Sequence, residues 1–368
     1  MEDINIMKLV LNDKEIAHFL SSLINFNRFI DEVPFEWNET NRIYKRESKN
    51  KNLSNIETRG KSQLKIRKAI NDDAKTYISI LQQKIDEKRN KSFKNIHRNI
   101  RFFIKRLGKE NILELYKKSK IDNFIKTTGL QIDPDAEFVL RKDFKNISED
   151  CLIRHTVGQE KILLRKIDNQ YPFWFIDAGY TNFLESKKTF HRLVRNHLHH
   201  DSILDVPVDR MGMFKSFPMP WREDGEKILI IEPGPFAANI FHVDLKTWKY
   251  EVAKELRKYT DKKIVFRKKI DKKIRTNLYD KLRNEDYYCV VNINSNAATE
   301  AVWAGIPVIT LDKHITNPIT RQHLSDINNL YRPNLSQWLS SLSYSQFTYE
   351  ELINGTAVEI MRKYHVKD

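Results

Sequence analysis

The sequence predicts an α/β protein with a wound parallel sheet in its second half, further strands before it, and a strongly basic helical segment near the N-terminus. Three observations support this fold class. Between residues 227 and 311, short β-branched runs alternate with helical patterns, which is typical of parallel strands joined by helical crossovers. Residues 171–177, Tyr-Pro-Phe-Trp-Phe-Ile-Asp, form the strongest strand pattern of the first half. Residues 41–126 hold 25 Lys and Arg against nine Asp and Glu, and most of this segment has helical apolar spacing.

The stretch 290–311 is the most informative part of the second half. Residues 288–291 are an aromatic and β-branched run of strand length. Ser295 and Asn296 suit the N-cap of a helix over residues 297–304. Gly305 suits the position just past that helix, and Pro307 prevents the helix from continuing. The pattern therefore predicts strand, polar turn, short helix and strand.

The polar turn of this stretch lies where open α/β sheets bind their ligands. Such ligands sit beyond the carboxyl ends of the strands, and the free N–H groups at the start of a helix attract phosphate. Glu300 falls one turn into the helix, where a carboxylate can accept hydrogen bonds from a sugar diol. An ordinary βαβ unit with a capped helix and a solvated Glu300 would explain the same residues.

The run Ser-Asn-Ala-Ala-Thr-Glu-Ala-Val-Trp-Ala-Gly-Ile-Pro-Val-Ile, residues 295–309, resembles the donor-site signature of GT-B-fold glycosyltransferases. It is similar above all to that of bacterial capsule-type sugar transferases. The resemblance implies two Rossmann-like domains, a glutamate on the ribose of a nucleotide sugar, and a turn and helix start facing its phosphates. Sugar-nucleotide 2-epimerases share this shape without transferring sugar. The donor-binding candidates are Gly234, Pro235, Arg267, Lys268, Ser295, Asn296, Ala297 and Glu300.

Two pairs of these donor-binding candidates each follow a predicted strand that precedes the stretch 290–311 in the sequence. Gly234 and Pro235 follow a strand over residues 227–232, in the loop that the resemblance places near the nucleotide sugar, and a glycine there lets backbone approach a ligand closely. Arg267 and Lys268 end the next strand, where they would neutralise a diphosphate. Related transferases often carry His-Pro at this point, and this chain departs from that pattern.

The catalytic candidates come from the first half. Asp177 ends the strand over residues 171–177, and inverting sugar transfer needs a carboxylate or a histidine to take the acceptor proton. Asp177 is therefore the candidate general base, with His191 as the histidine alternative. A simple turn-forming aspartate would explain Asp177 equally, and a buried, hydrogen-bonded cluster would explain the histidines. Arg192 and Arg195 are candidates for contact with the acceptor or with phosphate.

No metal site is predicted, although four of the 11 histidines lie in residues 190–201. His197 and Asp201 would share one face of a helix, yet neither a His-Glu-x-x-His motif nor a cysteine partner accompanies them. The sequence also lacks the Asp-x-Asp motif of metal-dependent transferases. We expect no cofactor beyond the nucleotide-sugar co-substrate.

The formal net charge of +15 arises from residues 41–126, whose own excess is +16. Basic residues of this segment recur every three to four positions, so a helix would gather most of them on one face, where they suit a phosphate backbone. A solvated surface helix, or a codon bias toward Lys and Asn, explains part of the same pattern. The candidate nucleic-acid-binding residues are Lys94, Arg98, Arg101, Lys105 and Arg106.

The predicted organisation has five parts. A basic helical segment covers residues 1–126, within which 1–37 are mostly helical. An acceptor-side domain follows over 127–212, with candidate strands at 136–140 and 161–167. A linker at 213–226 leads to a donor-binding domain over 227–346, with helices at 244–259, 277–284 and 333–338. A helix over 348–364, in the last part at 347–368, crosses back to the first domain.

These features predict a cytoplasmic glycosyltransferase, in the host cytoplasm if the chain is viral. Its two cysteines form no metal-binding or redox motif, its start lacks a signal-peptide layout, and no apolar run approaches membrane-spanning length. The favoured acceptor is a hydroxymethylated pyrimidine in DNA, as in phage DNA-modifying glycosyltransferases. Two alternatives stay open: a transferase of capsule or lipopolysaccharide glycans at the membrane face, and a non-catalytic nucleic-acid-binding protein on a degenerate transferase fold.

Overall fold

A computed structural model of the chain describes residues 7–11, 124–141, 143–156, 158–185, 189–268 and 278–366. The chain divides into two compact units, the first comprising 1–8, 127–136 and 146–368, and the second 9–126 and 137–145. The first unit contains two sheets and the helices that cover them. In the described part of the second unit, strand β2 (Glu137–Leu140) is followed by Arg141, whose N–H donates to the carbonyl of Leu11 at 2.9 Å.

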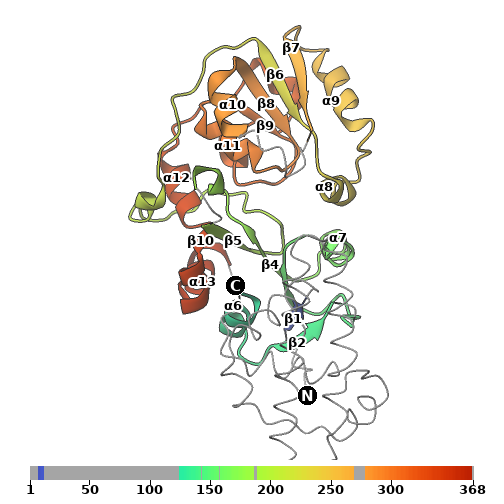
Figure 1. Ribbon diagram of the computed structural model, residues 1–368, viewed down its shortest axis with the longest axis vertical. Coiled ribbons are helices and arrows are strands. Elements are labelled where there is room, and N and C mark those ends of the chain that lie inside the picture. The colour runs from blue at the N-terminus through green and yellow to red at the C-terminus, as the bar shows by residue number, and fades with distance from the viewer. Residues whose placement is uncertain are drawn as a thin grey trace, which may run out of the picture. The chain divides into compact units, whose positions relative to one another are not determined.

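The parallel sheet predicted for the second half of the chain is confirmed, and its four strands lie in the order β7-β6-β8-β9 (Figure 1). We call it the parallel sheet. Its strands are β6 (Lys227–Ile231), β7 (Lys263–Arg267), β8 (Tyr287–Asn292) and β9 (Val308–Thr310). The helices between them are α8 (Pro235–Ile240), α9 (Trp248–Leu256), α10 (Leu278–Asn284) and α11 (Ala297–Trp303).

Strands β6, β8 and β9 of the parallel sheet are almost wholly buried, which explains their continuous apolar runs, whereas the edge strand β7 is partly exposed. Along β6, Ile228 and Ile230 pack with α9, whereas Leu229 and Ile231 pack with α10 and α11. This alternation follows from the two-residue repeat of a strand. Gly305 ends α11 with a φ of +73°, and a Cβ there would lie 2.2 Å from the carbonyl oxygen of Pro220. The left-handed helix end predicted at this glycine is confirmed.

The first half contributes a mixed sheet in the order β10-β5-β4-β3 within the first unit. Its strands in this part are β3 (Cys151–Arg154), β4 (Trp174–Ala178), β5 (Phe190–Arg195) and β10 (Phe347–Thr348), and the six-stranded sheet continues beyond β3 with β1 (Lys8–Leu11) and β2. Strands β3 and β4 are parallel, but β5 is antiparallel to both of its neighbours. This sheet therefore departs from the wholly parallel arrangement expected of a Rossmann-like domain. We call it the mixed sheet.

The strand prediction at residues 161–167 is wrong, because helix α7 (Glu160–Asp168) occupies them. Ile162, Leu163 and Lys166 are buried on one helical face, which a short apolar run does not distinguish from a strand. The Nζ of Lys166 donates to the carbonyls of Glu149 and Pro172, which satisfies this buried ammonium group.

Two further helix predictions are wrong in part. Residues 8–11, expected in a helix, form strand β1 (Lys8–Leu11), whose last three side chains are buried. Residues 190–201 form β5 and a turn, so His197 and Asp201 share no helical face. The remaining predictions for residues 1–37 and 41–126 fall almost wholly outside the described residues; of these segments the structure describes 7–11 and the C-terminal end, where helix α6 (Phe124–Ile132) begins.

The C-terminal segment is helical but interrupted. Helix α12 (Ser336–Ser343) precedes β10, and α13 (Tyr349–Asn354), α14 (Thr356–Ile360) and the π-helix η7 (Met361–His365) follow it. Gly355, with a φ of +99°, separates α13 from α14. Because β10 pairs with β5, the chain returns to the mixed sheet after the parallel sheet is complete.

The segment predicted as a linker, residues 213–226, packs against the end of α11. The N–H of Met219 donates to the carbonyl of Trp303 at 3.0 Å, and the N–H of Arg222 donates to that of Gly305 at 2.7 Å. Across the ranges that the structure describes, no helix has the length and apolar character needed to traverse a bilayer.

Candidate functional site

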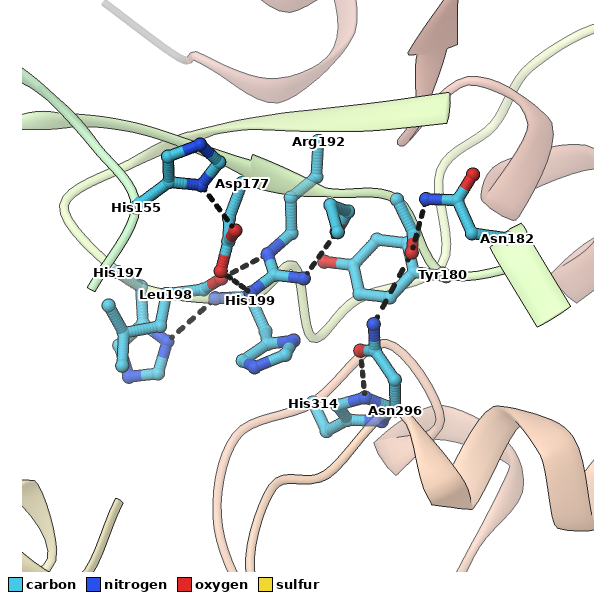
Figure 2. Close-up of polar contacts among 12 residues, drawn as sticks. His155, Asp177, Tyr180, Asn182, Arg192, His197, Leu198, His199, Asn296 and His314 are labelled. Atoms are coloured by element: carbon cyan, nitrogen blue, oxygen red, sulfur yellow. Dashed lines mark hydrogen bonds and ion pairs between the residues drawn. The ribbon is translucent and has the colours of Figure 1, made fainter. Parts of the chain in front are cut away.

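The carboxylate of Asp177 is the centre of a polar cluster at the carboxyl end of β4 (Figure 2). Its Oδ1 lies 3.0 Å from Nδ1 of His155, and its Oδ2 lies 3.3 Å from a terminal nitrogen of Arg192. Burial raises the pKa of this carboxyl, but the His155 hydrogen bond and the Arg192 charge outweigh burial and hold the pKa well below its usual range. Asp177 is therefore ionised throughout the physiological pH range.

Arg192 is held entirely by groups of the mixed sheet and the turn that follows it. It lies opposite Asp177 on β5, and its guanidinium also donates to the carbonyls of Ala178 at 2.6 Å and Leu198 at 2.8 Å. Its charged carbon lies 5.5 Å from the ring centroid of Tyr180. Each of its three nitrogens therefore has a hydrogen-bond acceptor within the protein, and Arg192 holds the Asp177 carboxylate in place.

His155 is a member of the cluster that the sequence analysis missed. It follows β3 directly, and its backbone N–H still donates to the carbonyl of Ile176 on β4 at 2.9 Å. Its φ of +61° is left-handed, which is uncommon for a residue other than glycine. A signal was present in the sequence, since the short, largely apolar run of residues 151–154 has the length of a strand and directly precedes His155.

His191 and Arg195 do not join this cluster. His191 lies on the face of the mixed sheet opposite Arg192, because alternate residues of β5 point to opposite sides, and it is buried there. Arg195 also lies on the face away from Arg192 and donates to Oδ1 of Asp150 at 2.7 Å. The structure therefore brings Asp177 and Arg192 together and places the other two candidates apart from them.

Two of the histidines that follow β5, His199 and His200, are buried, and burial lowers the pKa of both. The N–H of His200 donates to the hydroxyl of Tyr180 at 3.0 Å, and its ring lies 4.1 Å from that of His365 between centroids. The ring of His199 lies 4.7 Å from that of His314. Burial and the nearby Arg192 charge lower the pKa of His199 and of His314, for the latter to about 3. The expectation of a buried histidine cluster describes these residues well.

The turn before α11, which belongs to the parallel sheet, makes hydrogen bonds to the mixed sheet and to the buried histidines. Nδ2 of Asn296 donates to the carbonyl of Gly179, one residue after β4, at 3.3 Å, and its Oδ1 lies 3.5 Å from Nε2 of His314 (Figure 2). His314 in turn bonds the hydroxyl of Thr316 at 3.0 Å through Nδ1. The turn that carries the transferase-like motif thus lies against the strand that carries Asp177.

The turn is braced internally by its own polar groups. The N–H of Ser295 donates to Oδ1 of Asn292 at 2.8 Å, and the N–H of Ala297 donates to Oγ of Ser295 at 3.3 Å. Two buried groups at this end of β8 and α11, Nδ2 of Asn292 and Oγ1 of Thr299, have no hydrogen-bond partner among the described residues. This hydroxyl and this amide are thus buried and unsatisfied, whereas two of the backbone N–H groups of the turn are satisfied.

Glu300 lies one turn into α11 and is half-buried. Burial raises the pKa of its carboxyl to about 7, against the opposing charge of Arg267 and a backbone hydrogen bond from Tyr279. Arg267 ends β7 and Lys268 follows it, while Gly234 and Pro235 begin α8 beyond β6. These donor-site candidates all lie at the carboxyl end of the parallel sheet.

The five candidate nucleic-acid-binding residues, Lys94, Arg98, Arg101, Lys105 and Arg106, lie outside the described residues. Within the described ranges, no group of three or more His, Cys, Asp and Glu is placed to hold a metal ion.

Comparison with known proteins finds likenesses among solved structures. No protein-family model matches the chain, and no curated protein matches it. It is similar to the solved structure of the beta Kdo 2,7 transferase of Thermosulfurimonas dismutans KpsC, at 12% identity and a TM-score of 0.35, over 65% of this chain and 97% of that one. It is also similar to the beta Kdo 2,4 transferase of the same KpsC, at 13% identity and a TM-score of 0.32, over 63% and 93%. At these TM-scores the likeness assigns neither an activity nor an acceptor to this chain.

Proposed function

We propose that the chain is a nucleotide-sugar-dependent glycosyltransferase with a GT-B-like arrangement of its two sheets. The observation that supports this most is the hydrogen bond from Asn296 to the carbonyl of Gly179. It joins the turn of the transferase-like motif to the strand end that carries Asp177. A donor at the carboxyl end of the parallel sheet would then have its reactive carbon near a carboxylate–imidazole pair.

In this proposal the parallel sheet binds the nucleotide. Glu300 accepts hydrogen bonds from the ribose, Arg267 and Lys268 neutralise phosphate charge, and the turn of Ser295, Asn296 and Ala297 faces the phosphates. Gly234 and Pro235 lie in the neighbouring loop. The pKa of Glu300 supports this role, since a half-ionised carboxyl of this kind gains most from a ligand that satisfies its charged form.

The mixed sheet handles the acceptor. An acceptor hydroxyl loses its proton as its oxygen attacks the anomeric carbon. Asp177 near the end of β4 and His155 directly after β3 are the groups of this cluster that could take that proton. The acceptor favoured on sequence grounds, a hydroxymethylated pyrimidine in DNA, stays a prediction because the basic residues that motivate it lie outside the described ranges. A capsule or lipopolysaccharide glycan stays the alternative acceptor.

A thermal-shift screen of nucleotide sugars tests the donor part. We expect at least one to stabilise the wild-type protein and to lose this effect in Glu300→Ala, since a bound ligand stabilises by an amount set by its affinity. Asp326→Ala is a matched control, because Asp326 lies in the first turn of the 3₁₀-helix η6 (Leu324–Asn328) and is not a candidate site residue. Stabilisation by none of the nucleotide sugars would contradict the proposal.

A further inference from the structure

We infer that His155 is the catalytic base of the proposed sugar transfer and that Asp177 is its positioning residue. The inference rests on the proposed function, and it replaces Asp177, the base expected from the sequence, with a residue that the sequence analysis did not select. Four features of the site support it: how Asp177 is bound, which imidazole nitrogen is left open, how exposed the ring is, and how the backbone holds it.

Asp177 is a poor proton acceptor in this setting. Both of its oxygens are already paired, one with His155 and one with Arg192. These partners hold its pKa well below its usual range. A base is most effective when its pKa lies near the working pH, so a strongly acidic carboxyl removes a hydroxyl proton inefficiently.

The same hydrogen bond prepares His155 for the task. An ionised Asp177 can only accept, so Nδ1 of a neutral His155 carries the proton and Nε2 carries the lone pair. No described residue bonds that Nε2. Its side chain is 31% exposed, whereas His191, His199 and His200 are buried. Within the described cluster, His155 therefore presents an open basic nitrogen to solvent and to a substrate.

The backbone conformation of His155 supports a functional role. A φ of +61° is costly for a side chain of this size, and such strain is concentrated at functional sites. The conformation follows from two constraints on this residue. Its N–H stays in register with β4 through Ile176, while its ring turns to meet Asp177 on the same strand.

Atoms and charges balance in the proposed step. The acceptor oxygen forms a bond to the anomeric carbon of the donor sugar, and its proton moves to Nε2 of His155. The bond from that carbon to the phosphate oxygen breaks, and the phosphate of the nucleotide leaves with the electron pair. The imidazolium that results is stabilised by the charge of Asp177 and later returns its proton to solvent.

The test compares two histidines with the same backbone conformation. His155 and His242 both have a left-handed φ, of +61° and +51°, but the His242 side chain is 68% exposed and lies near Asp168 on α7. Asparagine tolerates this conformation, so His155→Asn and His242→Asn carry a similar backbone cost. We expect His155→Asn to lower kcat by about 10²- to 10⁴-fold with donor affinity unchanged, and His242→Asn to stay within about twofold of wild type.

The pH profile separates a base from a structural residue. The acidic limb of kcat/KM should be present in the wild type and absent in His155→Asn. Asp177→Asn should lower the rate while keeping the shape of the site. A His155→Asn protein that transfers sugar at a rate close to wild type, with its acidic limb intact, would overturn the inference.

A second measurement does not depend on turnover. In protein labelled with ¹⁵N at histidine, the His155 signals are assigned by their loss in His155→Asn, or in His155→Gln should the first variant fold poorly. We expect His155 as the Nδ1–H tautomer in the wild type, with that preference lost in Asp177→Asn. The opposite tautomer in the wild type would refute the inference, whether or not a donor is found. A wild-type protein that binds no nucleotide sugar, yet shows the expected tautomer, would instead contradict the proposed function alone.

Discussion

Replacing Glu300 by Gln should stabilise the ligand-free protein at high pH and not at low pH. In the folded protein the pKa of Glu300 is raised from 4.5 to about 7, because burial penalises the charged carboxylate. A carboxyl with a raised pKa contributes stability that is complete below the unfolded value near 4.5 and is lost as the pH rises through 7. The difference between these pKa values corresponds to about 3 kcal/mol.

Chemical denaturation at pH 5 and pH 8 measures this effect. Between these pH values we expect the free energy of unfolding of the wild type to fall by about 2–3 kcal/mol relative to that of Glu300→Gln. Glu251→Gln is the control, because Glu251 occupies the first turn of α9 and is exposed. If the free energies of unfolding of wild type and Glu300→Gln differ by the same amount at pH 5 and pH 8, burial is not the source of a shifted pKa.

The same titration should couple to donor binding. If the ribose hydroxyls bind only the ionised carboxylate of Glu300, about 1% of the protein is competent at pH 5 and most of it at pH 8. Donor affinity should then rise by up to about 100-fold across this range, and the rise should vanish in Glu300→Gln. Calorimetry in two buffers of different ionisation enthalpy would also detect the proton released on binding.

Three other predictions concern the joint between the sheets and the basic segment. Gly179→Ala should lower the free energy of unfolding by about 1–3 kcal/mol in the same denaturation assay, because the new Cβ would lie 2.6 Å from Cβ of Phe190. Gly212→Ala is the control, since its Cβ meets open space and should change that free energy by less than about 0.5 kcal/mol. Asn296→Ala and His314→Ala should each cost about 1 kcal/mol and be non-additive in a double-mutant cycle, since the two side chains share one hydrogen-bonded chain; additive effects would count against that chain. Replacing the basic residues between 94 and 106 by Gln should make duplex DNA binding less dependent on salt. The slope of the logarithm of the binding constant against the logarithm of the salt concentration should become shallower by about 0.9 for each phosphate that is no longer neutralised. DNA binding that is absent or insensitive to salt in a titration would remove DNA as the acceptor.

The second half of the fold was predictable because its signals are local. Strands of the parallel sheet are continuous apolar runs, and the turn around Ser295 and the break at Gly305 follow from backbone preferences alone. The prediction at residues 161–167 failed because a short apolar run fits both periodicities. The pairing of β10 with β5, whose strands lie far apart in sequence, has no local signal at all.

The candidate site was predictable in part for a similar reason. Asp177 was identified because it ends an apolar strand, and the structure places it in a polar cluster. Arg192 was expected to contact the acceptor or phosphate, but strand pairing decides that its donors go to Asp177, Ala178 and Leu198. His155 was missed because residues 151–154 were not predicted as a strand, so the residue after them was not recognised as lying at a strand end.

The most direct test of the central proposal is acceptor-dependent release of free nucleotide from a nucleotide sugar, followed by mass spectrometry of the acceptor. The protein should be supplied with the donor selected by thermal shift and with either hydroxymethylated duplex DNA or a capsule-type glycan. We predict that wild type adds one sugar mass to one of these acceptors. Asp177→Ala should abolish the addition, and Asp168→Ala should leave it intact. Addition of equal amount by wild type and Asp177→Ala, or none by wild type with a donor that it binds, would contradict the account.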